Sequence, residues 1–221
     1  MENFISLDLL FRWLHVIFGI TWIGLLYYFN FIQGEYFKEA EPNAKADATK
    51  KLAPRALWWF RWGAMFTFIT GVILLVYIRG NNGINSYMMM GALMGTLMFL
   101  NVWLIIWPNQ KIVIGIVEGD AAKAGPKALL ASRTNTLFSL PMTLGMLGSA
   151  HGGGNAGSVV EHAAAGAAQP MTMGLIAVIA LIIALEINAI VGKTGPMASV
   201  KGVIHCSVAL TVVCLALLQY V

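Results

Sequence analysis

Charged residues are scarce in this sequence: Lys, Arg, Asp and Glu make up 11% of its 221 residues, whereas 58% are hydrophobic. A soluble domain of this size cannot bury so much apolar surface, so the composition favours a protein that crosses a membrane several times. Cysteine is also scarce, and Cys206 and Cys214 form neither a CxxC nor a CxxCH motif. Covalent c-type haem and a zinc site of the usual spacing therefore have no support. A disulfide is disfavoured as well, because eight residues in one helix separate the two positions by about 12 Å.

Long apolar segments are abundant instead. Six of them are long enough to cross a hydrocarbon core of about 30 Å, and lipid admits only helices or closed barrels. Their approximate bounds are 9–32, 56–78, 87–107, 134–150, 171–191 and 200–221. We therefore predict an all-α, polytopic membrane helical bundle of about six transmembrane helices, in a single domain over residues 1–221. The acidic-polar start and the long first apolar run argue against a cleavable signal peptide.

The basic residues predict the orientation. The connections after the first, third and fifth segments hold Lys38, Lys45, Lys50, Lys51, Arg55, Lys111, Lys123, Lys127, Arg133, Lys193 and Lys201. On the opposite side only Arg79 lies in a loop, with Arg12 near a helix end. The positive-inside rule then places both termini in the periplasm and the chain in a bacterial inner membrane. Residues 33–55 would form a cytoplasmic arm, and the Gly/Ala-rich residues 151–170 a periplasmic loop.

His15 lies inside the first segment, where an ionisable residue needs a partner and is a candidate for function. Gly19 and Trp22 follow one and two turns later on the same helical face, which leaves room for a flat ligand such as haem. Arg12, one turn nearer to water, suits a haem propionate. The alternative is a neutral histidine that is hydrogen-bonded to a neighbouring helix.

The predicted depth of the other histidines in the membrane indicates which of them can share a ligand with His15. His151 closes the fourth segment on the periplasmic side, so His15 and His151 together suit six-coordinate b-type haem between helices. An interfacial histidine that begins a loop is the alternative. His162 sits in the flexible loop, where solvation explains it. His205 belongs to the other half of the membrane, more than about 10 Å deeper, and implies a separate metal site.

Polar side chains also gather near the predicted cytoplasmic face. They are Arg61, Asn109, Gln110, Arg133, Asn135, Glu186 and Asn188. Such a group can bind an anion or relay protons. We favour a structural interpretation, in which Glu186 forms a buried ion pair with Arg61 or Arg133. Gly91 with Gly95, and Gly145 with Ser149, have the small-residue spacing of closely packed helices.

Four blocks of sequence resemble the N-terminal membrane domain of the bacterial membrane-bound urate hydroxylase (urate oxidase) family. They are "LDLLFRWLHVIFGITWIGLLYYFNFIQ", "NVWLIIWPNQK", "ASRTNTLFSLPM" and "LEINAIVGKTGPMASVKGVIH". The resemblance implies a membrane redox module, with His15, His151 and His205 as haem or metal candidates. It implies a polar signature of Trp107, Pro108, Asn109, Gln110, Arg133, Asn135, Glu186 and Asn188. Relatives of this type carry a fused c-type cytochrome, whereas here we expect a short stand-alone form that needs a separate electron acceptor.

Three hypotheses of function follow. The first is a redox module that binds haem b and exchanges electrons with a separate cytochrome c or respiratory complex, with urate hydroxylation as its enzymatic form. The second is a haem-free accessory subunit of a larger membrane complex, for which the methionines and small-residue faces are suited. The third and weakest is a small-molecule transporter whose path includes Arg61, Glu186 and His205. The expected partners are lipid and other subunits, and no feature suggests a nucleic acid.

Overall fold

The computed structural model describes residues 6–81, 84–151, 158–160 and 172–221, and it confirms the all-α prediction. The helices are α1 (Leu7–Tyr27), α2 (Gly34–Glu39), α3 (Pro42–Asp47), α4 (Ala53–Asn81), α5 (Ser86–Leu100), α6 (Trp107–Val113), α7 (Ala121–His151), α8 (Met173–Val191) and α9 (Val200–Tyr220). Three π-helical segments, η1 (Tyr28–Gln33), η2 (Ala48–Leu52) and η3 (Asn101–Ile106), continue these helices, and η4 (Gly195–Ala198) is a 3₁₀ turn. The sequence did not predict the short antiparallel pair of β1 (Ile84–Asn85) and β2 (Ser158–Val160).

Five helical stretches in the described residues are long and apolar enough to cross a membrane. They are Leu7–Glu39, Pro42–Arg79, Ser86–Val113, Met173–Val191 and Val200–Tyr220. The chain is therefore a multi-pass membrane protein. The fourth predicted segment, 134–150, is helical and lies in α7, but α7 is not among the five because Arg133, Asn135 and other polar residues interrupt its apolar residues.

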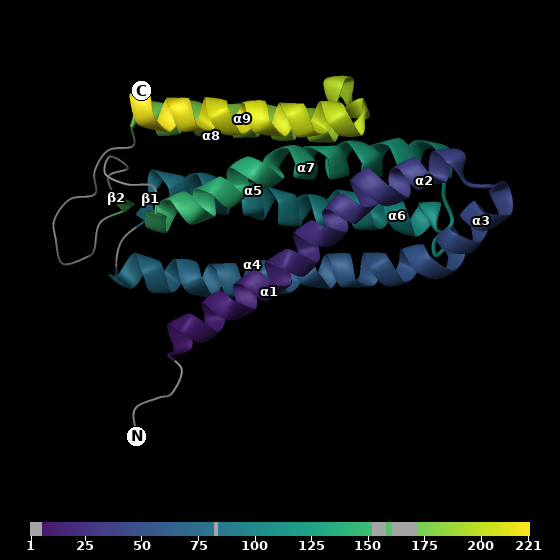
Figure 1. The fold of residues 1–221 in the computed structure, drawn as a ribbon, viewed down its shortest axis with the longest axis horizontal. Coiled ribbons are helices and arrows are strands. Elements are labelled where there is room, and N and C mark those ends of the chain that lie inside the picture. Colours follow the sequence, from purple (N-terminus) through teal and green to yellow (C-terminus); the bar gives the residue numbers. More distant parts are fainter. Residues whose placement is uncertain (1–5, 82–83, 152–157, 161–171) are drawn as a thin grey trace.

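The polar helix α7 lies inside the bundle. Figure 1 shows the long helices running along one axis, with α7 between the α8–α9 pair and the layer that contains α4. It contacts α1, α5, α6, α8 and α9. Thr134, Asn135, Thr136 and Ser139 of α7 are all buried. The central position explains the composition, since these side chains meet other helices rather than lipid.

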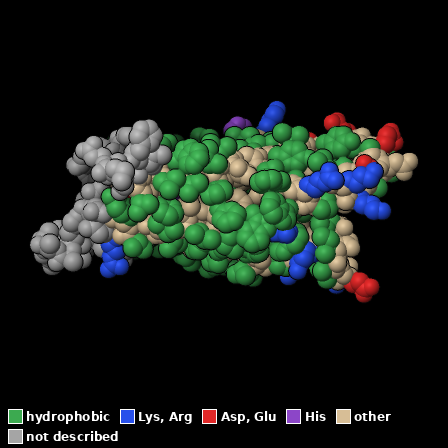
Figure 2. Space-filling view, turned by 90° about the horizontal axis from the view of Figure 1, so that it is seen from below, with side chains coloured by type: hydrophobic (Ala, Val, Ile, Leu, Met, Phe, Trp, Pro, Cys, Tyr) green, Lys and Arg blue, Asp and Glu red, His purple; other side chains and the backbone are tan. Residues whose placement is uncertain are grey.

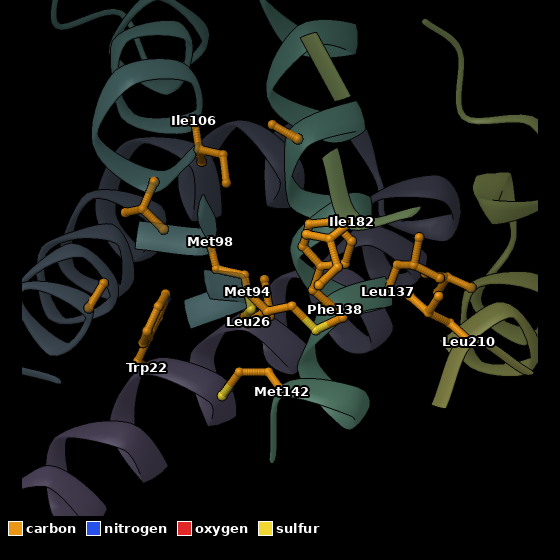
Figure 3. Packing of buried hydrophobic residues seen from close by; sticks show 14 of the residues in the cluster. Trp22, Leu26, Met94, Met98, Ile106, Leu137, Phe138, Met142, Ile182 and Leu210 are labelled. Carbon is orange, nitrogen blue, oxygen red and sulfur yellow. The ribbon is translucent and has the colours of Figure 1, made fainter. Parts of the chain in front are cut away.

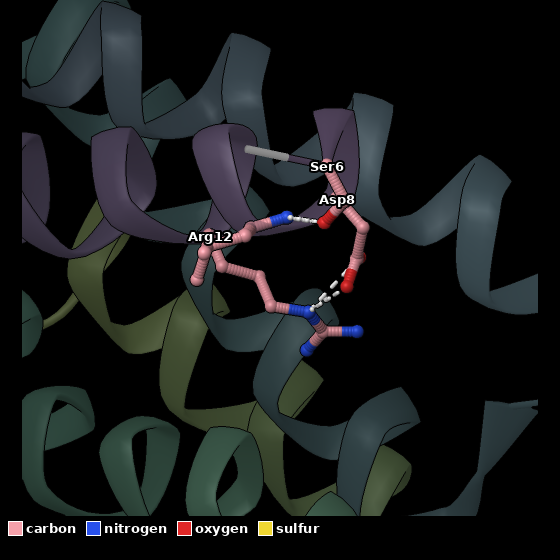
Figure 4. Close-up of polar contacts among 4 residues, drawn as sticks. Ser6, Asp8 and Arg12 are labelled. Atoms are coloured by element: carbon pink, nitrogen blue, oxygen red, sulfur yellow. Dashed lines mark hydrogen bonds and ion pairs between the residues drawn. The ribbon is translucent and has the colours of Figure 1, made fainter. Parts of the chain in front are cut away.

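Side chains at the helix starts fix where the apolar helices begin. Ser6 caps α1, because its Oγ accepts a hydrogen bond from the backbone N–H of Leu9 at 3.2 Å. Asp8 in the first turn pairs with Arg12 one turn later, at 2.8 Å (Figure 4). Thr172 and Ser199 cap α8 and α9 in the same way as Ser6. One of the otherwise unpaired N–H groups at each of these helix starts therefore has an acceptor.

Methionine and phenylalanine form the centre of the apolar core. Met90, Met94 and Met98 lie one turn apart on α5 and are fully buried, opposite Phe138 and Met142 of α7 (Figure 3). The unbranched thioether side chains fill irregular space between helices well. The core is therefore centred on the contact between α5 and α7.

A close approach of two backbones marks this same contact. A Cβ added to Gly145 of α7 would lie 2.7 Å from the carbonyl oxygen of Tyr87 and 2.8 Å from the nitrogen of Gly91 on α5. A Cβ on Gly91 would lie 3.1 Å from the nitrogen of Met146. No side chain fits at these separations, so the packing role predicted for these glycines is confirmed.

Pro141 inside α7 is accommodated by a side chain from another helix. Proline has no N–H, so the carbonyl oxygen of Leu137, four residues earlier, loses its helical donor. The hydroxyl of Ser207 on α9 donates to that oxygen at 2.8 Å. Ser207 is 1% exposed. A helix that would otherwise carry an unsatisfied carbonyl in the bundle is thereby completed by its neighbour.

The surface separates apolar and charged regions along the bundle axis. Figure 2 shows apolar side chains over the middle of the molecule and charged side chains concentrated at the end that holds α2 and α3. Exposed apolar residues include Ile20, Val76 and Leu104, at 65%, 69% and 68%. Such a surface is suited to lipid and not to water. The start of α1 and the end of α9 lie at the opposite end from α3 (Figure 1).

Candidate functional site

His15 lies at the crossing of α1 and α4. Its Nδ1 is 3.0 Å from Oγ1 of Thr70, and the imidazole ring lies against Gly71 of α4. A Cβ on Gly71 would lie 3.0 Å from Cε1 of His15. The missing side chain at Gly71 therefore gives the imidazole its place between the two helices.

The hydrogen bonds of Thr70 determine which ring nitrogen carries the proton. The Thr70 hydroxyl has one hydrogen, and its Oγ1 lies 2.7 Å from the carbonyl oxygen of Phe66 and 3.0 Å from that of Thr67. When that hydrogen points to either backbone carbonyl, Oγ1 of Thr70 accepts from Nδ1–H of His15; when it points to Nδ1, Thr70 donates to His15 instead. In the first arrangement Nε2 carries the free lone pair. This is how a metal-binding histidine is usually held, with one nitrogen fixed by a second residue and the other available as ligand.

The other residues predicted around His15 do not face a common opening. Arg12 is exposed and paired with Asp8. Gly19 faces α4, where an added Cβ would lie 4.0 Å from Cγ2 of Thr67. Trp22 is 2% exposed in the core, and its Nε1 has no hydrogen-bond acceptor. The structure therefore brings Thr70 and Gly71 to His15, in place of the three residues that the helical spacing had suggested.

The remaining histidines are placed only in part. His151 is the last residue of α7, and its side chain lies outside the described residues. His162 also lies outside them. His205 is exposed on α9. Across the described ranges no three His, Cys, Asp or Glu side chains come together as a metal-binding group. The pairing of His15 with His151 stays a prediction.

A second polar site lies deep between α5, α7 and α8. The amide nitrogen of Asn101 donates to Oδ1 of Asn135 at 3.0 Å and to Oε2 of Glu186 at 3.1 Å. Asn135 in turn donates to the carbonyl oxygen of Met98 at 2.9 Å. All three polar residues are buried. Together they join three helices with a connected set of hydrogen bonds.

Asn101 did not emerge from the sequence as a member of this site. The available signal was a single amide within the apolar run 97–106. It begins η3, and π-helical segments are frequent at functional sites. Thr70 was missed in the same way, since a threonine in an apolar helix commonly bonds only to its own backbone.

The predicted ion pair of Glu186 is wrong. Glu186 accepts from Asn101, and no ion pair in the described part of the chain includes Glu186, Arg61 or Arg133. The guanidinium carbon of Arg61 lies 3.8 Å from the centre of the Trp107 ring, so this cation is held by an aromatic face. The neutral amide of Asn101 reaches Glu186 from η3, and this contact replaces the charge partner that composition alone had suggested.

The rest of the predicted polar group has local roles. Asn109 donates to the carbonyl oxygen of Ile105, one turn earlier. Asn188 exchanges hydrogen bonds with the backbone of Lys193, which closes the end of α8. The predicted group thus divides into the Asn135–Glu186 site, the Arg61–Trp107 stack, the local bonds of Asn109 and Asn188, and Arg133, while Gln110 is half-buried on α6.

Comparison with known proteins gives one match. The family model described as "Urate oxidase N-terminal" matches residues 77–162, which include α5, the polar part of α7 and Asn101. No curated protein and no solved structure matches the chain. The matched segment covers less than half of the chain and contains Asn101 and Asn135 of the second polar site, whereas His15, Thr70 and Gly71 precede it.

Proposed function

From the match of residues 77–162 to the urate oxidase N-terminal family, we propose that this chain is a membrane-embedded redox module that binds haem b through His15. The observation that carries the proposal is the 3.0 Å contact of His15 Nδ1 with Oγ1 of Thr70. In the proposal Nδ1–H donates to Thr70, so Nε2 is free as an iron ligand. The other axial ligand in this proposal is His151.

Each residue near His15 has a definite task in the proposal. Thr70 holds the ring orientation and the tautomer, and Gly71 leaves the space in which the ring lies. Iron in haem b supplies one-electron chemistry when it is bound, with a potential set by its ligands and by burial. Exposed Arg12, which pairs with Asp8, lies near the start of α1.

The electrons are exchanged with a separate protein in this proposal, either a cytochrome c or a respiratory complex. Urate hydroxylation is the enzymatic form, with urate as the electron donor. The match to the family supports the urate-hydroxylase-like relationship. The excess of Lys and Arg at the α2–α3 end supports a bacterial inner-membrane location with that end in the cytoplasm.

The first experiment measures the haem of the purified full chain. A dithionite-reduced minus oxidised spectrum and a pyridine haemochrome assay are expected to give a b-type signal. His15→Ala is expected to remove that signal, whereas His162→Ala, at the histidine for which solvation in a loop was predicted, is expected to keep it. A folded, haem-free wild-type protein would overturn the proposal and favour the accessory-subunit alternative. Full haem content in His15→Ala would exclude His15 as a ligand.

Variants of Thr70 separate a positioning role from a merely structural one. Thr70→Val removes the acceptor for Nδ1–H, which makes the imidazole a weaker donor to iron. The midpoint potential is expected to rise, because the oxidised iron loses more stabilisation than the reduced iron. Thr70→Ser keeps the hydroxyl and is expected to retain the wild-type potential. Equal potentials in all three proteins would contradict the role of Thr70.

Urate oxidation coupled to added cytochrome c then tests the enzymatic form of the proposed function.

A further inference from the structure

Glu186 is a buried acidic residue that no cation in the described part of the chain neutralises. It lies in the span Met173–Val191 and is 8% exposed. None of the ion pairs among the described residues includes it. Its Oε2 accepts a hydrogen bond from Asn101, whose amide carries no charge. Burial of a charge without compensation is strongly unfavourable, so a positive ion in contact with this carboxylate would stabilise it.

Oxygens from two helices converge on one point beside η3. Oε2 of Glu186 and Oδ1 of Asn135 lie 3.1 and 3.0 Å from the same atom, the amide nitrogen of Asn101. The orientation of Asn135 is fixed, because its own amide nitrogen donates to the carbonyl oxygen of Met98 at 2.9 Å. Asn101 and Asn135 are 1% and 0% exposed. These contacts join η3, α7 and α8 in a buried polar site.

The side chain of Asn101 determines what this point holds. With its nitrogen inward, the amide donates to both oxygens. A half turn about the Cβ–Cγ bond exchanges its nitrogen for its oxygen at almost no change in shape. Three oxygens, one of them bearing the charge of Glu186, then face one another. Such an arrangement is favourable only when a positive ion lies among them.

The charge and the ligand type of these oxygens define the ion. One carboxylate balances one positive charge, so a divalent ion would leave a net positive charge inside the bundle. Carboxylate and amide oxygens are hard ligands and suit alkali ions better than soft transition metals. An organic cation is too large for a point that a single amide nitrogen fills. Na⁺ sites of membrane proteins lie where helices depart from α geometry, and Asn101 begins the π-helical η3.

We propose that Glu186, Asn135 and Asn101 form a binding site for one Na⁺ ion. In the ion-free state the amide nitrogen of Asn101 takes the place of the ion, and on binding the amide turns its oxygen inward. The bound ion holds η3, α7 and α8 together through ligands from all three. The proposal goes beyond the proposed function because it requires no haem and uses none of the residues at the α1–α4 crossing.

The first experiment measures the binding of radioactive sodium to the purified full chain in detergent micelles, by a scintillation proximity assay. We expect one saturable site per chain, from which unlabelled Na⁺ displaces the label and choline does not. K⁺ is expected to displace it at least about tenfold less effectively than Na⁺. A folded wild-type protein without saturable binding would overturn the inference, and equal displacement by K⁺ would overturn the assignment to Na⁺.

Thermal unfolding gives a second measurement that does not depend on a label. An ion that binds only the folded protein stabilises it, and the effect grows with the ion concentration. The melting temperature is therefore expected to be higher in sodium chloride than in choline chloride at the same ionic strength. Equal melting temperatures over a full titration of both salts would count against the site.

A matched pair of carboxylate variants identifies the charged ligand. Glu186→Gln is expected to weaken sodium binding at least about tenfold and to remove the difference between the two salts. In choline chloride its melting temperature is expected to exceed that of the wild type, because a buried charge is removed. Glu35→Gln is the control, at an exposed carboxylate that pairs with Lys38, and is expected to bind sodium as the wild type does. Unchanged binding by Glu186→Gln would overturn the inference.

A second pair of variants tests the amide. Asn101→Leu is expected to abolish sodium binding, because it removes the oxygen that completes the site. Asn109→Leu is the control, since the Asn109 amide bonds to the carbonyl oxygen of Ile105 in its own helix. Full sodium binding by Asn101→Leu would exclude Asn101 as a ligand and contradict the proposed rotation of its amide.

A proton is the competing occupant of the site, and the outcomes distinguish it. A wild type whose unfolding is independent of Na⁺, together with a Glu186→Gln variant of equal stability, would show that Glu186 is neutral and would overturn the inference. The haem proposal is tested separately, because Glu186→Gln is expected to keep the haem spectrum. A haem-free wild type with intact sodium binding would overturn only the haem proposal.

Discussion

Pro141 leaves the carbonyl oxygen of Leu137 without its helical donor, and Ser207 provides a hydroxyl from α9. Other single polar residues in the bundle act in the same way across helix contacts: the Tyr27 hydroxyl pairs with Ser139 at 2.8 Å, and Asn101 joins Asn135 to Glu186. At the scale of the residue, hydrogen bonds between helices therefore complete groups that lipid leaves without partners.

Ser207→Ala is expected to destabilise the bundle by about 0.5–1.5 kcal/mol, because the carbonyl oxygen of Leu137 then has no donor. In a Pro141→Ala background the same change is expected to have little effect, since the introduced alanine restores the helical N–H. Unfolding in mixed micelles measures both differences as a double-mutant cycle. Thr211→Val is the control, because the Thr211 hydroxyl bonds only to its own helix, at the carbonyl oxygen of Ser207. Equal losses in both backgrounds would contradict this role of Ser207.

The sequence predicted His15 and the polar residues of α7 as special, but not their partners. An ionisable or amide side chain in an apolar run is visible from composition, whereas its hydrogen-bond partner depends on how two helices cross. Thr70 lies 55 residues from His15, and Asn101 lies 85 residues from Glu186. The predicted Glu186 ion pair is wrong for this reason. The sequence shows which residues are charged, but it does not show which side chain lies next to Glu186.

At the scale of elements, the contact of α5 with α7 depends on the absence of side chains at Gly91 and Gly145. The two backbones approach so closely that the carbonyl oxygen of Tyr87 and the nitrogen of Gly91 occupy the space of a Cβ at Gly145. The GxxxG spacing predicted this packing. The three π-helical segments were not predicted, because an insertion of one residue leaves almost no mark on a uniformly apolar sequence.

Gly145→Ala is expected to separate α5 from α7 and to destabilise the bundle by about 1–3 kcal/mol, because the added methyl group overlaps backbone atoms. Gly24→Ala is the matched control, since an added Cβ there meets nothing within 4 Å in the described chain. It is expected to be neutral or slightly stabilising, because alanine favours helix over glycine. Thermal unfolding of both variants in the same detergent gives the comparison. A Gly145→Ala protein as stable as the wild type would contradict the expectation, because it would show that α5 and α7 do not need their close contact.

At the scale of the whole molecule, the start of α1 and the end of α9 lie at one end of the bundle and α3 at the other (Figure 1). The all-α class and five of the six predicted spans follow from apolar length alone. The position of α7 was predictable only in part, because its polar residues weaken the apolar signal and only the assembled bundle explains them.

The predicted orientation is tested by labelling single cysteines with an impermeant maleimide in intact spheroplasts. With Cys206 and Cys214 replaced by alanine, a cysteine at Tyr220 is expected to react from outside. A cysteine at Lys45 in α3 is expected to react only after the membrane is opened, since basic residues favour the cytoplasm. Reaction of both positions from outside would contradict the topology, and the reverse pattern would invert the bundle.

The polar composition of α7 has a consequence for biogenesis. Arg133, Asn135 and Thr136 are each unfavourable in lipid. The transfer of α7 by itself from the translocon into the bilayer is therefore only weakly favoured in free energy. Its stable place exists only where Asn101 of η3 and Ser207 of α9 supply hydrogen bonds, and Ser207 lies later in the chain. Integration of α7 is therefore coupled to the arrival of α9, and the hydrogen bonds of α7 remain incomplete until α9 has been synthesised.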